Sequence, residues 1–469
     1  MPGAQAAAQS GNDLPIAPTP AVSVYQSRLP GGVTVQRATP GPVPLSLDDA
    51  IATGLKHSLE IELGAQNERR VRGLERTVEN KLLPTVSAEA YTRTQEINLA
   101  AMGFKPSSLG ALLGSSSAAN FKTIVKVDTT AAQLNVSQQL FNVPAYFLYR
   151  AAKSAVSSSN LTTLNARGDV ALAVGTTYLA VIADAAQIEN ERALVKTDEV
   201  ALEQARDLQS AGVGTHLDTL RAQVQLQTEQ QALVSAEDQL AKDKIELNRR
   251  MGIAADQEMV LTDSVPYVEL AHMEMADLMV LSFQRRKDLL SLEGQMEVAN
   301  RTQKAVRYER LPTVAFGGYY GVLGETHGLY HGVFAAQGSL NFPIFKEAEF
   351  RGEREVADAQ IAGLRRQIES LRITIEQQIR SSLLDVESAN ELVKVAQSNV
   401  VLSRQELDDA QQRFAAGVSD NLPAVQAESR LAGSQSQVVR TMYQYNAAKL
   451  QLARNVGVVE SQYKSYLGR

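Results

Sequence analysis

The residues that most often carry out chemistry in proteins are sparse and scattered in this sequence. The chain has no cysteine among its 469 residues, which excludes thiol nucleophiles, cysteine-ligated metals and disulfides. His327 and His331 stand four residues apart, a spacing that can hold a metal on a helix, but Gly328 and Gly332 beside them favour a hairpin loop. The sequence lacks a phosphate-binding loop, a nucleophile elbow and a zinc-protease motif. We therefore expect no catalytic residue, no metal site and no cofactor.

The stretch QSAGVGTHLDTLRAQ, residues 209–223, interrupts a long helical pattern with Ala-Gly-Val. Thr215 and Asp218 have the spacing of a helix N-cap followed by an acidic residue three positions later. Gly212 has the place of a helix C-cap, where glycine adopts a positive φ. A second break, RFAAGVSDNLPAVQA, follows at residues 413–427, with Pro423 at a position suited to the first turn of a helix.

Composition excludes several classes of function. The net charge is −6 and no basic run stands out, so we expect no nucleic-acid partner. Aromatic residues make up only 5% of the chain, which favours helices packed through Ala, Leu and Val. We find no apolar run of about 18 residues and predict no transmembrane helix. Membrane-crossing strands would leave no such run, so they stay open.

The chain is a tandem duplication. Residues 205–252 align without a gap on residues 410–457 at a shift of 205, which pairs Leu217 with Leu422. The segment VSQQLFNVPAYFLYRA aligns on LNFPIFKEAEFRGERE, and LLPTVS at 82–87 aligns on RLPTVA at 310–315. The first copy carries about two dozen extra residues, roughly 98–123, whose Gly and Ser content predicts a surface loop.

Each copy has the same order of predicted elements. A helix is followed by two strands, a long helix and, after the Ala-Gly-Val break, a return helix. The helices are predicted at 46–82, 145–210 and 216–251, then at 274–310, 347–414 and 421–456; the strands are predicted at 84–97 and 124–140, then at 312–323 and 332–345.

These elements define five segments. Residues 1–45 hold eight of the fifteen prolines and form an extended N-terminal segment. The first repeat covers 46–256, a linker covers 257–273, the second repeat covers 274–457, and a C-terminal tail covers 458–469.

The predicted strands alternate between two kinds of side chain. One side of FAAQGSLNF carries Phe, Ala, Gly, Leu and Phe, and the other carries Ala, Gln, Ser and Asn. Four strands per chain cannot close a barrel, which needs about eight, and would leave open edges. Three chains would supply twelve strands, and strands of about ten residues suit a bilayer. The long helical runs, about 100 Å each, have the pattern of antiparallel coiled coils.

This order of elements resembles the TolC-type outer-membrane factor family. LPTV at the start of each hairpin, LF or PIF at its end, and Gly-Val followed by LDTLRAQ carry the resemblance over residues 46 to about 457. It implies a mainly helical, tandem-duplicated protomer of a homotrimer, with a twelve-stranded outer-membrane β-barrel continued by a periplasmic α-helical barrel. It also implies an exit channel of a tripartite efflux or type I secretion system. The expected partners are outer-membrane lipid, a periplasmic adaptor (membrane fusion protein) and an inner-membrane pump.

The resemblance also implies where these segments lie. The linker at 257–273 would lie near the equatorial region, and the two breaks would form the periplasmic tip. The resemblance further implies that Gly212 with Val213, and Gly417 with Val418, form the turns that contact the adaptor. The periplasmic entrance would be lined by four residues near these turns, Leu217, Asp218, Asp420 and Leu422. From the residues alone, each turn glycine is equally well a helix C-cap, and Asp218 equally well a capping residue.

Two other classes of function stay open at this point. A non-channel periplasmic coiled-coil scaffold or adaptor would be soluble as a monomer without detergent. A soluble hydrolase with an unrecognised site would lose its activity when one acidic residue is changed. The paired alternating strands argue against the first class, and the absence of any catalytic motif argues against the second.

Overall fold

The computed structural model describes residues 41–102, 122–263, 267–416, 418–419 and 422–468. These residues form two compact units. The first comprises Val71–Ala155 and Glu297–Ala362, and the second comprises the described residues up to Arg70, Val156–Met296 and those from Gly363 onward. The long helices α5 (Val143–Ser210) and α9 (Glu347–Ala415) each run through both units.

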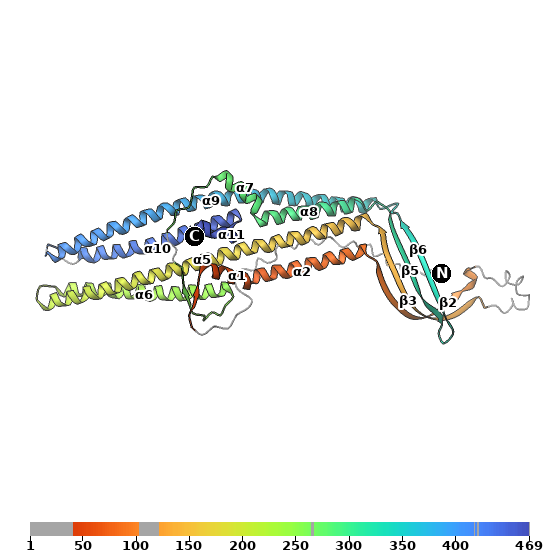
Figure 1. Ribbon diagram of the computed structural model, residues 1–469, viewed down its shortest axis with the longest axis horizontal. Coiled ribbons are helices and arrows are strands. Elements are labelled where there is room, and N and C mark those ends of the chain that lie inside the picture. Colours follow the sequence, from red (N-terminus) through yellow and green to blue (C-terminus); the bar gives the residue numbers. More distant parts are fainter. Residues whose placement is uncertain (1–40, 103–121, 264–266, 417, 420–421, 469) are drawn as a thin grey trace, which may run out of the picture. The chain divides into compact units, whose positions relative to one another are not determined.

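The first unit is built around a four-stranded antiparallel sheet. Its strands are β2 (Thr85–Asn98), β3 (Ile124–Phe141), β5 (Thr313–Glu325) and β6 (Tyr330–Asn341), in the order β2-β3-β5-β6 (Figure 1). All four predicted strands are therefore confirmed, two in each copy. The last strand begins two residues before its predicted start and ends at Asn341, because Pro343 lacks the N–H that a ladder needs.

The second unit is helical, with two hairpins of antiparallel helices. In one, α5 lies beside α6 (His216–Met251), and in the other α9 lies beside α10 (Leu422–Val456) (Figure 1). Near their turns, both hairpins pack through small apolar side chains: Leu202 and Ala205 meet Ala222 in the first, and Ala410 meets Ala424 and Ala427 in the second. Small residues let the two helix backbones approach closely, so the hairpins can stay narrow over their length.

The larger core of the second unit is formed by the long helices together with several short ones. Helices α1 (Leu47–His57), α7 (Met275–Arg285) and α11 (Val459–Leu467) pack with α5, α6, α9 and α10 around buried Leu47, Tyr178 and Leu450. Strands β1 (Val43–Leu45) and β4 (Met259–Leu261) form a small parallel pair beside it. The Tyr178 hydroxyl donates to the carbonyl of Leu45 (2.9 Å), which ties the N-terminal strand to the long helix.

Three expectations need correction. The predicted C-terminal tail is helix α11, whose Val459, Tyr463 and Leu467 are buried in the core. The predicted linker and N-terminal segment each contribute one strand, β4 and β1. The prediction of no long apolar run was wrong for α5, which contains an 18-residue window of mean hydropathy 1.4. Many apolar residues of α5 belong to the helical core, so packing explains the window.

The first helix of each copy is also interrupted, which the sequence did not reveal. In copy one, α1 and α2 (Leu59–Glu79) are separated at Ser58, whose ψ is 130°. In copy two, α7 and α8 (Lys287–Arg307) are separated at Arg286, whose ψ is 117°. The two breaks are 228 residues apart, the same shift that aligns the LPTV segments, so the interruption belongs to the repeated unit.

Candidate functional site

The strand register divides the sheet into one polar and one apolar face. Residues directly opposite one another in neighbouring strands point to the same face. One such row across the four strands is Ser87, Asn135, Tyr319 and Ala335, and the next is Glu89, Gln133, Gly321 and Val333. The Asn135 amide donates to the Glu89 carboxylate (3.3 Å) on this face. This is the polar side that the alternation predicted.

The opposite face is apolar and exposed. Its rows are Val86, Val136, Gly318 and Ala336, then Ala88, Leu134, Tyr320 and Phe334. Tyr320 is 69% exposed and Phe334 is 78% exposed. Contiguous apolar surface of this kind is costly in water and marks contact with lipid or protein. With 12 to 18 residues, each strand is also long enough to cross a hydrocarbon layer.

Both edges of the sheet are open in the part of the chain that the structure describes. Strand β2 pairs only with β3, and strand β6 pairs only with β5. An unpaired edge exposes a row of backbone N–H and C=O groups, which is untenable inside a membrane unless another strand satisfies them. The described sheet therefore has two edges, β2 and β6, that are able to pair with further strands.

The turn after α5 is a glycine-dependent helix ending. Gly212 has a φ of +77°, its N–H donates to the carbonyl of Gln209 (3.1 Å), and the N–H of Val213 donates to that of Leu208 (3.0 Å). These two hydrogen bonds form a Schellman motif. The C-cap prediction for Gly212 is thus confirmed, and the motif turns Val213 outward, where it is 76% exposed.

The turn after α9 has the matching feature in its described part. The N–H of Val418 donates to the carbonyl of Arg413 (3.0 Å), the bond that Val213 makes to Leu208 in copy one. Val418 is 74% exposed. Gly417 and Asp420, the other predicted residues of this turn, lie outside the described residues. Two apolar side chains are therefore presented on equivalent turns.

The predicted entrance residues of copy one begin helix α6. Asp218 and Thr215 form a capping box: the Asp218 N–H donates to Oγ1 of Thr215 (3.2 Å), and the Thr215 N–H donates to Oδ2 of Asp218 (3.2 Å). Arg221 also lies 3.7 Å from the carboxylate. The capping interpretation of Asp218 is confirmed. Its charge is shared with a helix N-terminus and an arginine, which weakens any electrostatic effect on a passing ion.

Leu217 and Leu422 are apolar residues at the starts of the two return helices. Leu217 is 54% exposed and Leu422 is 36% exposed. Leu422 is the first residue of α10, where Pro423 follows it in the first turn as predicted. An exposed leucine side chain forms no hydrogen bonds with water, so burying it is favourable. Both side chains are therefore available for contact with another chain.

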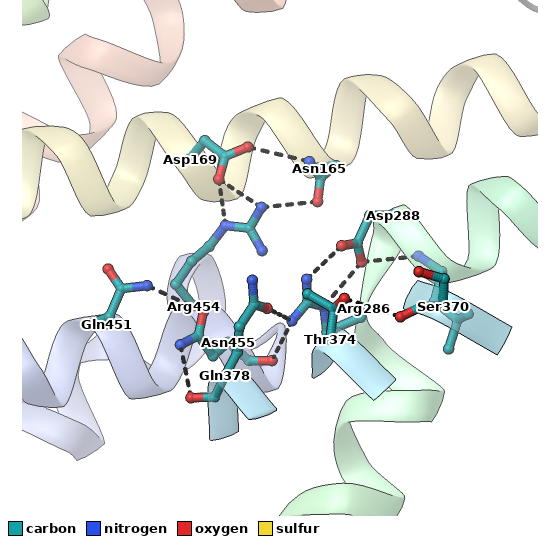
Figure 2. A network of polar contacts seen from close by, with 11 residues as sticks. Asn165, Asp169, Arg286, Asp288, Ser370, Thr374, Gln378, Gln451, Arg454 and Asn455 are labelled. Atoms are coloured by element: carbon teal, nitrogen blue, oxygen red, sulfur yellow. Dashed lines mark hydrogen bonds and ion pairs between the residues drawn. The ribbon is translucent and has the colours of Figure 1, made fainter. Parts of the chain in front are cut away.

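A polar network fastens the hairpins at the end away from their turns (Figure 2). Arg454 of α10 donates from Nε to Asp169 (2.6 Å) and from Nη2 to Asn165 (3.0 Å), both on α5. Arg286, at the break between α7 and α8, pairs with Asp288 (2.5 Å) and donates to Gln378 of α9 (2.5 Å). Charged hydrogen bonds of this kind resist separation of the helices they join.

The network also lowers the pKa of one of its members, Asp288. Burial alone would raise the pKa of Asp288, but its hydrogen bonds and charge interaction with Arg286, the Leu289 N–H and the charge of Arg454 together hold it below the ordinary value. Asp288 therefore stays ionised, and the network keeps its charge pairing at neutral pH.

Sequence analysis missed one set of charged residues altogether. Asp184, Glu191 and Asp198 lie on α5 seven residues apart and face other carboxyl groups on α6 and α10. The seven-residue spacing was the available signal, but acids on a helix usually indicate a solvated face. Of the His327–His331 pair, His327 has a φ of +73° in the turn between β5 and β6, as the hairpin-loop interpretation predicted, whereas His331 is the second residue of β6. Among the described residues, no group of three or more His, Cys, Asp or Glu side chains is suited to a metal ion.

Comparison with known proteins identifies the architecture. The sequence matches the outer membrane efflux protein family over residues 55–252 and 278–458. It is 23% identical to the toluene efflux pump outer membrane protein TtgF of Pseudomonas putida over 426 residues, which cover 87% of this chain and 82% of TtgF.

Solved structures share the fold. The Campylobacter jejuni CmeC outer membrane channel aligns with a TM-score of 0.73 and 14% identity, over 88% of this chain and 86% of CmeC. The open state of the Neisseria gonorrhoeae MtrE outer membrane channel aligns with a TM-score of 0.71 and 16% identity, over 91% and 95%. The fold class expected from the duplicated order of elements is confirmed, and the scaffold and hydrolase alternatives are set aside. Because the family match covers more than half of the chain, the chain belongs to the outer membrane efflux protein family, a family of channels rather than enzymes, and is an outer-membrane channel of an efflux pump.

Proposed function

We propose that three copies of the chain form one channel, with a twelve-stranded barrel in the outer membrane and a helical tube in the periplasm. The observation that carries this proposal is the sheet with two open edges and opposite faces of opposite polarity. Joining β6 of one chain to β2 of the next removes every edge after three chains if the ring closes. The apolar face then meets lipid, and the polar face lines the lumen.

The proposed partners bind at the turns of the two helical hairpins. We assign the two helical turns, with exposed Val213 and Val418, to the adaptor, and we retain Gly417 as part of the second turn. An adaptor that buries these valines would gain apolar contact area without rearranging the Schellman motif that presents Val213. The inner-membrane pump would deliver cargo through this adaptor to the helical tube.

The entrance is proposed to close mainly through leucine. Three copies would gather Leu217 and Leu422 around one axis as an apolar ring, which resists the passage of ions by excluding water. Asp218, already engaged by its capping box and Arg221, would tune cation passage, and Asp420 is retained as a second acidic candidate.

The trimer is tested by measuring mass in detergent. Purified chain extracted from membranes should have the mass of three chains after subtraction of bound detergent, and its strand content should match that of the described sheet. A monodisperse monomer that keeps the strand signal would contradict the barrel.

The adaptor assignment is tested by changing the two exposed valines together. Val213→Asp with Val418→Asp should abolish capture of the chain by the cognate adaptor, because a carboxylate placed in an apolar contact loses its hydration. Val213→Ile with Val418→Ile keeps the apolar surface and is the control. Unchanged capture by the aspartate variant would show that the adaptor binds elsewhere.

The entrance is tested by single-channel conductance in planar bilayers. Leu217→Ser with Leu422→Ser should raise conductance several-fold, because hydroxyl groups hold water in the constriction. Asp218→Asn should leave conductance similar and chiefly weaken block by divalent cations. A leucine double variant that conducts like the parent would place the constriction at other residues.

A further inference from the structure

Helix α5 carries three carboxyl groups along one line, two of them buried and the third, Asp184, half-buried. Asp184, Glu191 and Asp198, which we call the acidic stripe, are spaced by seven residues and so occupy the same face of the helix. Glu191 is only 6% exposed and Asp198 only 3% exposed. Buried Ile188, Leu194 and Leu202 interleave with them, so the stripe lies within a packed helix interface rather than in water.

Each member of the stripe faces another acid. Asp184 faces Asp243 of α6, Glu191 faces Glu229 of α6, and Asp198 faces Glu428 of α10, and Glu229 and Glu428 are themselves buried. Two ionised carboxylates have no proton to donate and repel each other, whereas a carboxyl that keeps its proton can donate to its partner.

The surrounding groups do not neutralise these carboxyls. Gln187 donates to Glu191 and also to Ser436 of α10 (2.7 Å), and Gln225 donates to Glu229 (2.9 Å). Tyr443 of α10 lies near Asp184 and Asp243. These neutral donors satisfy single oxygen atoms, and they leave one buried oxygen without a hydrogen-bond partner on each residue of the stripe.

Two basic residues on α6 and α10 have carboxylate partners of their own. Arg250 of α6 pairs with Glu246 (2.9 Å), and Arg430 of α10 pairs with Glu406 of α9 (2.6 Å). Among the described residues, no lysine or arginine forms an ion pair with a carboxyl of the stripe or with one of its acidic partners. The charge of an ionised pair would therefore remain uncompensated.

Burial and these acidic partners raise the pKa values of several of the carboxyl groups. Burial first, and then Glu428, raise the pKa of Asp198 to about 7. Burial and Asp243 raise the pKa of Asp184 to about 7, and burial with Glu191 and Asp198 raises that of Glu229 to about 6. Burial and Glu229 also raise the pKa of Glu428, although its bond from Asp198 opposes the shift.

The position of the stripe gives the titration a mechanical consequence. The Asp198–Glu428 pair joins α5 of the first hairpin to α10 of the second, and so does the contact of Gln187 with Ser436. Farther from the turns, the same two helices are fastened by Arg454 to Asp169 and Asn165. The Arg454 contacts pair opposite charges, whereas the Asp198–Glu428 contact depends on a proton.

We propose that the Asp198–Glu428 contact of the acidic stripe is a proton-dependent latch between the two hairpins. With protons shared, the Asp198–Glu428 pair holds α5 and α10 together. When the protons leave, like charges in a low-dielectric interface repel, and the hairpins part on the turn side of the Arg454 network. The consequence for conduction rests on the proposed entrance, because parting the hairpins would withdraw the leucine ring and open the channel as pH rises.

The direction follows from proton linkage. A carboxyl whose pKa is raised in the folded protein binds more protons there than in the unfolded chain at pH values between the two pKa values. The stabilisation it supplies is complete below the ordinary pKa near 4 and is lost as pH rises through about 6 to 7. The latch is therefore closed at pH 5.5 and released at pH 8.

The latch can be measured as a distance because the chain contains no cysteine. Gln204→Cys on α5 and Gln426→Cys on α10 place spin labels at exposed, uncharged positions on the turn side of Asp198. Labelled chains should be a minority among unlabelled ones, so that each assembly holds one pair of labels. Pulsed electron paramagnetic resonance should show a longer and broader label distance at pH 8 than at pH 5.5, reversibly.

Matched variants assign the shift to the proposed pair. Asp198→Asn with Glu428→Gln mimics the protonated state and should hold the short distance at both pH values. Glu199→Gln removes an exposed charge beside Asp198, and Glu191→Gln with Glu229→Gln alters a pair inside the first hairpin; both should keep the shift. A parent distance that does not change with pH, or a double amide variant that still shifts, would overturn the latch.

Conductance distinguishes the latch from the proposed channel. If the parent conducts, conductance should rise from pH 5.5 to pH 8 and should stay low at both values in the Asp198→Asn, Glu428→Gln variant. A protein that shows the pH-dependent distance but never conducts contradicts the proposed channel and supports the latch. A protein that conducts equally at both pH values, with unchanged distances, supports the channel and contradicts the latch.

Discussion

At the scale of single residues, the sequence position of Asp218 is compatible with two roles, an entrance residue and a helix cap. Its contacts in the structure show only the cap. Its place after a turn glycine suggested an entrance residue, while its hydrogen bonds with Thr215 make it part of a helix cap. The cap could be predicted because its two members are three residues apart in the sequence. The acidic stripe could not, because its partners are distant in the sequence and lie on two other helices.

The cap makes a local prediction. Thr215→Ala removes the side chain that accepts from the Asp218 N–H and should destabilise the first turn of α6 by about 1 kcal/mol. Amide hydrogen exchange of residues 217–219 should become about fivefold faster. Thr228→Ala removes a threonine from the interior of the same helix and is the control. Equal exchange in Thr215→Ala and parent would mean that the cap does not stabilise the helix.

At the scale of elements, the sequence revealed the ends of helices better than breaks within them. Helix α6 has its predicted bounds because a capping box begins it and Gly252, with a φ of +72°, ends it. The interruptions at Ser58 and Arg286 involve neither glycine nor proline. Arg286 instead uses its side chain to bond Asp288 and Gln378, so tertiary contacts stabilise its extended backbone. Such a break has no local signal.

The turn glycine makes a prediction at this scale. Gly212→Ala places a Cβ on a residue with a φ of +77° and should cost about 1 kcal/mol, seen as about fivefold faster exchange of the Val213 and Gly214 amides. Gly363→Ala, on exposed helix α9 with no atom near the added Cβ, should have the opposite effect and slow local exchange. If both substitutions changed exchange in the same direction, the positive φ would not explain the turn.

At the scale of the whole molecule, the duplication was visible because both copies keep the same order of elements and the same strand alternation. The sheet edges could be inferred from four strands being too few, and the structure confirms which strands they are. The division into two units was not expected, because α5 and α9 run through both without a sequence boundary. Domain limits placed between repeats therefore differ from the units in which the chain packs.

The open edge makes a prediction about assembly. Along β6, neighbouring residues direct their N–H groups alternately toward β5 and away from it. Of Ala336→Pro and Gln337→Pro, one should disrupt the internal ladder, and the other should remove only an outward donor. The second variant should keep its strand signal while the mass in detergent falls below that of three chains. Retention of the full trimer by both variants would indicate that β6 does not join the next chain.

The two edges differ in sequence, and this has a genetic consequence. A variant chain whose β6 edge cannot pair still has a β2 edge that can. Such a chain can join a ring, but the ring that contains it cannot close. When equal amounts of the parent chain and the variant chain assemble at random in threes, only about one ring in eight contains parent chains alone. Such an allele would be dominant over the parent gene in the same cell, whereas an allele that prevents folding altogether would be recessive.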